Sequence, residues 1–201
     1  MYPTFIVLAA LLFASANAPA ASVTAPPPAV AEAIKVDGEF TEAAWQQAPA
    51  VTGFLQRIRS ALAPGDLLLL GADLVKSEAD LLLAYDDPLG VTAAFNRNLL
   101  VRINRELGGD FDLSAFAHRA VWDPEHQRIE MHLVSVSDQM VRIPAADSTV
   151  RFASNEWIWT ESSYKYTADQ IVDMGAEASF TCRDQWVDGD AGFALTLFTA
   201  L

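Results

Sequence analysis

The chain has 201 residues, of which 52% are apolar and 19% charged, a composition typical of a globular protein. Its 26 Asp and Glu outnumber 13 Lys and Arg, so the net charge of −13 disfavours nonspecific attraction to nucleic acid or anionic lipid. The single cysteine, Cys182, excludes an internal disulfide framework and a cysteine-based zinc cluster, and we expect it to be an inert core residue. No apolar run reaches the roughly 20 residues that a membrane-spanning helix needs.

Residues 1–22 resemble a secretory signal peptide, because the apolar run Phe5–Phe13 is followed by mostly small residues in Ala14–Ala20. No Lys or Arg precedes the run, so a frayed apolar tail or a start codon placed too early is the alternative. Residues 23–33 are rich in Ala and Pro, which favours an extended linker. We therefore expect an irregular N-terminal region.

Residues 34–53 contain the pattern V-D-G-x-x-x-E-A-A-W-x-x-A-P, in which Ile34 and Val36 alternate before the turn Asp37-Gly38. This pattern is similar to the opening of a β-sandwich module of the family 9 carbohydrate-binding type. The strands that would complete a sandwich do not follow, and a lone strand and turn cannot bury its own apolar face. Sugar binding is therefore disfavoured.

From residue 54 the pattern changes to alternating helices and strands. Apolar residues at helical spacing predict a helix over Phe54–Leu62, which Pro64-Gly65 ends. The apolar run Leu67–Asp73 predicts a strand buried on both faces of a parallel sheet, as in the second half of a βαβ unit. A helix over Ser77–Tyr85 follows.

The next helix is expected to start at Thr92 as its cap and to carry an apolar stripe, Phe95, Leu99, Ile103 and Leu107. We interpret Asp86-Asp87 as a solvent-exposed turn whose side chains cap the helix, and Gly108-Gly109 is expected to end the helix. A short helical turn is expected over residues 112–116.

The remaining elements are mostly strands. We expect strands over His118–Trp122, Arg128–Val136, Met140–Ile143 and Thr149–Phe152, the second of them half-buried through Ile129, Met131 and Leu133. A capping box at Thr167-Ala-Asp-Gln170 opens a helix, and strands over Ser179–Arg183 and Phe193–Phe198 form a closing hairpin.

Two motifs stand out: Tyr85-Asp-Asp-Pro-Leu-Gly-Val-Thr-Ala-Ala-Phe-Asn-Arg-Asn98 and Thr160-Glu-Ser-Ser-Tyr-Lys-Tyr166. With Leu62-Ala-Pro-Gly-Asp66 and Gly71-Ala-Asp-Leu-Val-Lys76, they make residues 54–200 resemble the histidine-specific Nα-methyltransferase family of ergothioneine biosynthesis. The resemblance implies S-adenosylmethionine as cofactor and L-histidine as substrate, with hercynine as product. It also implies an α/β fold: the C-terminal half of a seven-stranded Rossmann-like class I methyltransferase, with an α+β substrate-recognition insert at about residues 74–165.

The resemblance implies five substrate-binding residues. Tyr85 corresponds to the tyrosine that binds the histidine carboxylate, Glu161 and Ser163 to the pair that binds the imidazole, and Thr92 and Met131 to pocket positions near that ring. A carboxylate and a hydroxyl complement either a neutral or a protonated ring, and a buried carboxylate favours the charged form. We name no catalytic base, because catalysis here depends on aligning a neutral amine with the methyl group.

The same residue types have simpler readings, which stay open. The segment Glu161–Ser163 is also typical of a solvated strand end, and Tyr85 of a packing residue at a helix end. His118, His126 and His132 have no i, i+4 spacing and no cysteine neighbours, so no metal site is expected.

No glycine-rich turn after a strand, the feature that holds the cofactor in such folds, occurs in the chain. We therefore consider three hypotheses: a truncated histidine methyltransferase segment from residue 54, a non-catalytic chimeric remnant, and an exported carbohydrate-binding protein. We expect a monomer with no nucleic-acid partner. The methyltransferase part implies a cytoplasmic location, and a functional signal peptide would instead place the protein in the periplasm or outside the cell.

Overall fold

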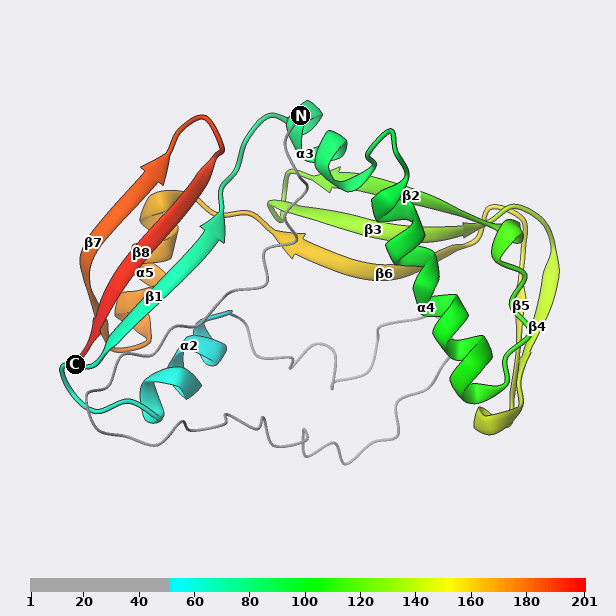
Figure 1. The fold of residues 1–201 in the computed structure, drawn as a ribbon, viewed down its shortest axis with the longest axis horizontal. Coiled ribbons are helices and arrows are strands. Elements are labelled where there is room, and N and C mark those ends of the chain that lie inside the picture. The colour runs from blue at the N-terminus through cyan, green and yellow to red at the C-terminus, as the bar shows by residue number, and fades with distance from the viewer. Residues whose placement is uncertain (1–50) are drawn as a thin grey trace. The chain divides into compact units, whose positions relative to one another are not determined.

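The computed structural model describes residues 51–201 (Figure 1). The signal-like segment, the linker and nearly all of the predicted sandwich fragment therefore lie outside the described residues. The chain forms two compact units. One, which we call the flanking unit, combines the described residues up to Val75 with Tyr166–Leu201, and the central unit is Lys76–Lys165. Between residues 51 and 201, no helix is long and apolar enough to cross a membrane.

The flanking unit is a three-stranded sheet with two helices. Its elements are α2 (Val51–Ser60), β1 (Leu67–Asp73), α5 (Ala168–Glu177), β7 (Phe180–Asp188) and β8 (Phe193–Ala200). The strand order is β1-β8-β7, and both pairings are antiparallel. The Leu67–Leu70 strand and the predicted closing hairpin therefore share one sheet.

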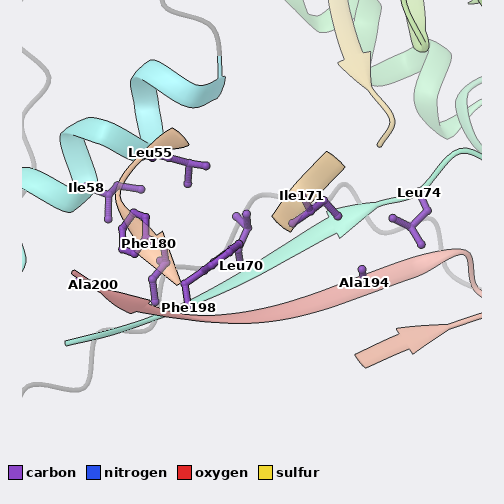
Figure 2. Close-up of a cluster of buried hydrophobic side chains, with 11 residues drawn as sticks. Leu55, Ile58, Leu70, Leu74, Ile171, Phe180, Ala194, Phe198 and Ala200 are labelled. Atoms are coloured by element: carbon purple, nitrogen blue, oxygen red, sulfur yellow. The ribbon is translucent and has the colours of Figure 1, made fainter. Parts of the chain in front are cut away.

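The core of this unit lies between the sheet and the helices α2 and α5 (Figure 2). Leu68 and Leu70 from β1 meet Leu55 from α2, Ile171 from α5 and Phe198 from β8, all of them buried. The prediction that β1 is buried on both faces of a parallel sheet is wrong. Leu67 and Leu69 stay half-buried, because β1 has an antiparallel neighbour and presents alternate residues to the helices.

Helix α5 begins with the predicted capping box. The Thr167 hydroxyl accepts from the Gln170 backbone N–H, and the Gln170 side chain accepts from the Thr167 N–H. In the last turn of the helix, Gly175 packs against the ring of Phe198, which a side chain at residue 175 would overlap. Glycine thus lets the helix approach β8 closely.

The central unit is built on a second antiparallel sheet, ordered β2-β3-β6. Its strands are β2 (Phe116–Asp123), β3 (Arg128–Ser135) and β6 (Trp157–Tyr164). Two helices, α3 (Glu78–Tyr85) and α4 (Val91–Leu107), pack on β2 and β3 (Figure 1). A hairpin of β4 (Gln139–Ile143) and β5 (Ser148–Phe152) and two short 3-10 turns complete the unit. Strand β6 was missing from the predicted elements, because its serines and glutamate lack a clear apolar alternation.

Helix α4 exists as predicted, but its buried face differs. Phe95, Leu99 and Leu107 are 51%, 46% and 41% exposed, whereas Asn96 and Leu100 are buried. Residues i and i+4 are separated by about 40° more than one full turn of the helix. A stripe built only from i+4 steps therefore rotates around the helix and moves away from the face that meets the sheet. The buried face therefore also depends on i+3 and i+7 neighbours.

The cap of α4 also differs from the prediction. The N-cap position is Gly90 in a left-handed conformation (φ 71°), not Thr92. The Asp87 carboxylate accepts from the backbone N–H groups of Val91 (3.1 Å) and Thr92 (2.8 Å), and these bonds lower the pKa of Asp87. The predicted capping duty of the Asp86-Asp87 turn is therefore confirmed at Asp87.

Candidate functional site

Tyr85 is the last residue of α3, and its backbone carbonyl belongs to a network of hydrogen bonds between buried polar groups. The carbonyl of Tyr85 lies 2.8 Å from Nε2 of His118 on β2. A carbonyl only accepts, so Nε2 carries the proton, and in a neutral ring Nδ1 then accepts from Nδ2 of Asn96 at 3.0 Å. The same Asn96 amide donates to the carbonyl of His132 at 3.1 Å, which ties α4 to β3. This network fixes the end of α3 relative to the sheet.

Strand β6 places Glu161 and Ser163 on one face, since side chains two residues apart point the same way, and Lys165 follows directly after the strand. Ser163 pairs with Ile129, and Glu161 with Met131. The register shifts immediately beyond this pair, where Thr160 is the extra residue and its hydroxyl donates to the Met131 carbonyl at 2.8 Å. Such a bulge bends the strand locally and re-aims neighbouring side chains.

Three polar side chains then meet in one cluster. The Tyr85 hydroxyl lies 2.7 Å from the Ser163 hydroxyl. The ammonium of Lys165 donates to Tyr85 Oη at 2.7 Å and to Ser163 Oγ at 3.0 Å, and it lies 4.6 Å from the centroid of the Tyr85 ring. Lys165 is only 1% exposed, so its charge is stabilised by protein partners, these groups among them, rather than by water. The cluster joins α3 to β6 across 78 to 80 residues of sequence.

Glu161 keeps access to solvent at the edge of this cluster. The surrounding protein removes part of its hydration, and this loss raises the pKa of its carboxyl above the ordinary value, while the positive charge of Lys165 acts in the opposite direction. An ionised carboxylate accepts hydrogen bonds, so Glu161 can accept from a cationic or N–H-bearing ligand.

The structure brings the five predicted site residues into the central unit. Met131 is buried beside Glu161, its strand partner. Thr92 lies in the first turn of α4, and its hydroxyl points to the carbonyl of Ala84, the neighbour of Tyr85, at 3.5 Å. Tyr85 and Ser163 are in direct contact, although the resemblance assigned them to opposite ends of the substrate.

Comparison with known proteins gives the family. Residues 44–200 match the model of the family described as histidine-specific, S-adenosylmethionine-dependent methyltransferases. The chain belongs to this family. It is 48% identical over 144 residues to the histidine N-alpha-methyltransferase of Mycolicibacterium smegmatis and 46% identical over 144 residues to that of Mycobacterium tuberculosis. Each alignment covers 72% of this chain but 45% of the relative, so the chain spans about half the length of these methyltransferases.

The matched family is described as S-adenosylmethionine-dependent, so a complete member needs a site for that cofactor. Folds of this type bind it with a glycine-rich turn between a strand and a helix. Within residues 51–201, the connections from β1 to α3 (74–77) and from β6 to α5 (165–167) contain no glycine. The described residues therefore supply no such turn for the cofactor, and we assign no cofactor-binding residue among them.

The structure adds three polar residues to this site: Asn96, His118 and Lys165. Asn96 and Lys165 lie inside the two motifs that carry the family resemblance, Tyr85–Asn98 and Thr160–Tyr166. Their position within those motifs was the only feature of the sequence that could have pointed to them. Their partners could not be inferred from sequence, because the contacts join segments 22 to 80 residues apart.

Proposed function

We propose that the chain carries the histidine-recognition part of an enzyme that transfers methyl groups from S-adenosylmethionine to the α-amino group of L-histidine, giving hercynine. Family membership supports this proposal, together with 48% identity to a histidine N-alpha-methyltransferase. The observation that carries it is the grouping of Tyr85, Ser163 and Glu161 around one patch of the central unit.

The chemistry of this patch suits an amino acid with an imidazole ring. We assign Glu161 and Ser163 to the ring nitrogens and Tyr85 to the carboxylate, with Thr92 and Met131 beside the ring. Polar groups that a wrong ligand leaves unpaired discriminate strongly, so amino acids without ring nitrogens are expected to bind poorly. Orientation of the amine, rather than a protein base, is then the contribution of this chain to catalysis.

We also propose that the flanking sheet is the end of a seven-stranded class I methyltransferase sheet, and that residues 76–165 form the substrate-recognition insert within it. For the N-terminal region we retain the proposal of a signal-like segment joined to a sandwich fragment. N-terminal sequencing tests it. A mature start near Ala21 supports export, and a start at Met1 contradicts it.

Histidine binding tests the proposed recognition role. Ser162 and Ser163 are adjacent on β6 but point to opposite faces, so they form a matched pair. With NMR-monitored titration of L-histidine into the 201-residue chain, we expect Ser163→Ala and Glu161→Ala to weaken binding roughly tenfold or more. Ser162→Ala should leave binding unchanged. Equal effects of Ser162→Ala and Ser163→Ala would contradict the assignment of this face.

A further inference from the structure

Lys165 limits what the neighbouring hydroxyl groups can do. Its ammonium donates to both Tyr85 Oη and Ser163 Oγ. A lysine ammonium has donors and no lone pair, so it cannot accept a proton from either hydroxyl. Both oxygens therefore act as acceptors toward Lys165, and each keeps one proton to place elsewhere.

The two hydroxyls share one of these protons. They lie 2.7 Å apart, so one of them donates to the other. Each hydroxyl has one proton and two lone pairs, which leaves a single hydroxyl proton in the pair for a ligand. If Tyr85 donates to the ligand, Ser163 has donated to Tyr85 and can only accept from the ligand.

The proposed function selects between the two directions. An ionised carboxylate only accepts hydrogen bonds, so Tyr85 must donate to the carboxylate of the substrate. Ser163 then accepts from the ring, and the Glu161 carboxylate accepts from it as well. A neutral imidazole has one N–H, whereas an imidazolium has two. Only the protonated ring can donate to Ser163 and Glu161 together.

We infer that the cluster of Lys165, Tyr85 and Ser163 makes this site select L-histidine with a protonated imidazole ring, with Lys165 as the positioning residue. This inference rests on the proposed function. The charges agree with it, since the negative Glu161 is assigned to the ring, and the ammonium of Lys165 donates to the Tyr85 hydroxyl that is assigned to the carboxylate. The titratable groups around the pair include Glu161 on β6, Lys165 directly after it, Tyr85 on α3 and His118 on β2, while β3 contributes the apolar Ile129 and Met131.

Nitrogen NMR of bound ¹⁵N-labelled L-histidine tests the inference at pH 8. At this pH only a few per cent of free rings are protonated, given an ordinary pKa of about 6.5. The two ring nitrogens have similar shifts in an imidazolium and widely separated shifts in a neutral ring. With the 201-residue chain in excess, we expect the imidazolium pattern, and affinity that weakens roughly tenfold from pH 7 to pH 8 as the protonated ligand becomes scarce.

A neutral-ring pattern in a bound ligand would overturn the inference while leaving the proposed function intact. Absence of histidine binding by the folded chain would contradict the proposed function, and the inference with it. Tyr85→Phe removes the acceptor of the Ser163 proton, so Ser163 can donate and the bound ring should shift toward the neutral pattern. Tyr164→Phe is the control, since that hydroxyl contacts Arg128 on the opposite face of β6, and it should keep the imidazolium pattern.

The role of Lys165 has its own readout. L-histidinol has the ring and the amine but no carboxylate, so the ratio of the two affinities reports the carboxylate contact. Lys165→Met should reduce the preference for L-histidine over L-histidinol roughly tenfold, because the Tyr85 hydroxyl loses the charge that polarises it. Lys165→Arg should largely retain the preference. An unchanged affinity ratio in folded Lys165→Met would show that Lys165 does not position the Tyr85 hydroxyl for the carboxylate.

Discussion

At the residue scale, Glu161, which we propose binds the substrate, is a group whose charge folding alone does not favour. Its carboxyl pKa is raised, so the folded chain binds a proton there more tightly than the unfolded chain does. The contribution of this group to folding is therefore most favourable below its unfolded pKa of about 4.3, and it is lost as pH rises through the folded pKa. Near pH 7 the ionised carboxylate opposes folding.

Replacing this group should separate stability from binding. We expect Glu161→Gln to raise the melting temperature at pH 7, because the poorly hydrated charge is removed, and to weaken histidine binding at the same time. At pH 4 the gain in melting temperature should shrink, since the wild-type carboxyl is then largely protonated. Thermal unfolding at the two pH values measures this. A lower melting temperature at pH 7 in the variant would show that Glu161 stabilises the fold instead.

At the scale of elements, strong local signals in the sequence located most helices and strands. The capping box at Thr167, the turn at Asp87 and the alternation of Ile129, Met131 and Leu133 all lie where the structure uses them. Partners distant in sequence explain the failures. Asn96 is buried in place of Phe95 because His118 and His132 supply its hydrogen bonds, and no pattern within α4 contains that information.

The candidate site, too, could be predicted from the sequence only in part. The family motifs supplied Tyr85, Glu161 and Ser163, but not the ammonium of Lys165 that joins two of them. The sequence also could not show whether β1 pairs in parallel or antiparallel. A run of leucines fits a parallel or an antiparallel strand, and only the pairing with β8 distinguishes them.

Gly175 offers a test of packing in the flanking unit. In an exposed helix interior, glycine to alanine stabilises by up to about 1 kcal/mol. At this position the added methyl group would overlap the buried Phe198 ring, so we expect Gly175→Ala to destabilise the chain by about 1–3 kcal/mol. Chemical denaturation measures the difference. Gly189→Ala, which meets no atom within 4 Å, is the control, and equal stability of the two variants would contradict the close approach of α5 and β8.

At the scale of the whole molecule, the described residues contain the proposed substrate site but no turn that would hold the cofactor. The central unit groups the residues assigned to histidine, whereas residues 51–201 contain no strand-to-helix glycine turn for the cofactor. We therefore expect the isolated 201-residue chain to show no measurable S-adenosylmethionine binding by titration calorimetry, with or without histidine. Micromolar binding would mean that a second copy, or residues outside the described range, complete a cofactor site.

Segment replacement tests the central claim most directly. The aligned 144 residues of the Mycolicibacterium smegmatis enzyme would be exchanged for those of this chain, at 48% identity, and hercynine formation followed by mass spectrometry. We predict that the hybrid enzyme forms hercynine. Glu161→Ala in the hybrid should raise KM for histidine more than it lowers kcat, because it removes binding that precedes the methyl transfer. A folded hybrid that binds S-adenosylmethionine but forms no hercynine would contradict the assignment of histidine recognition to this chain.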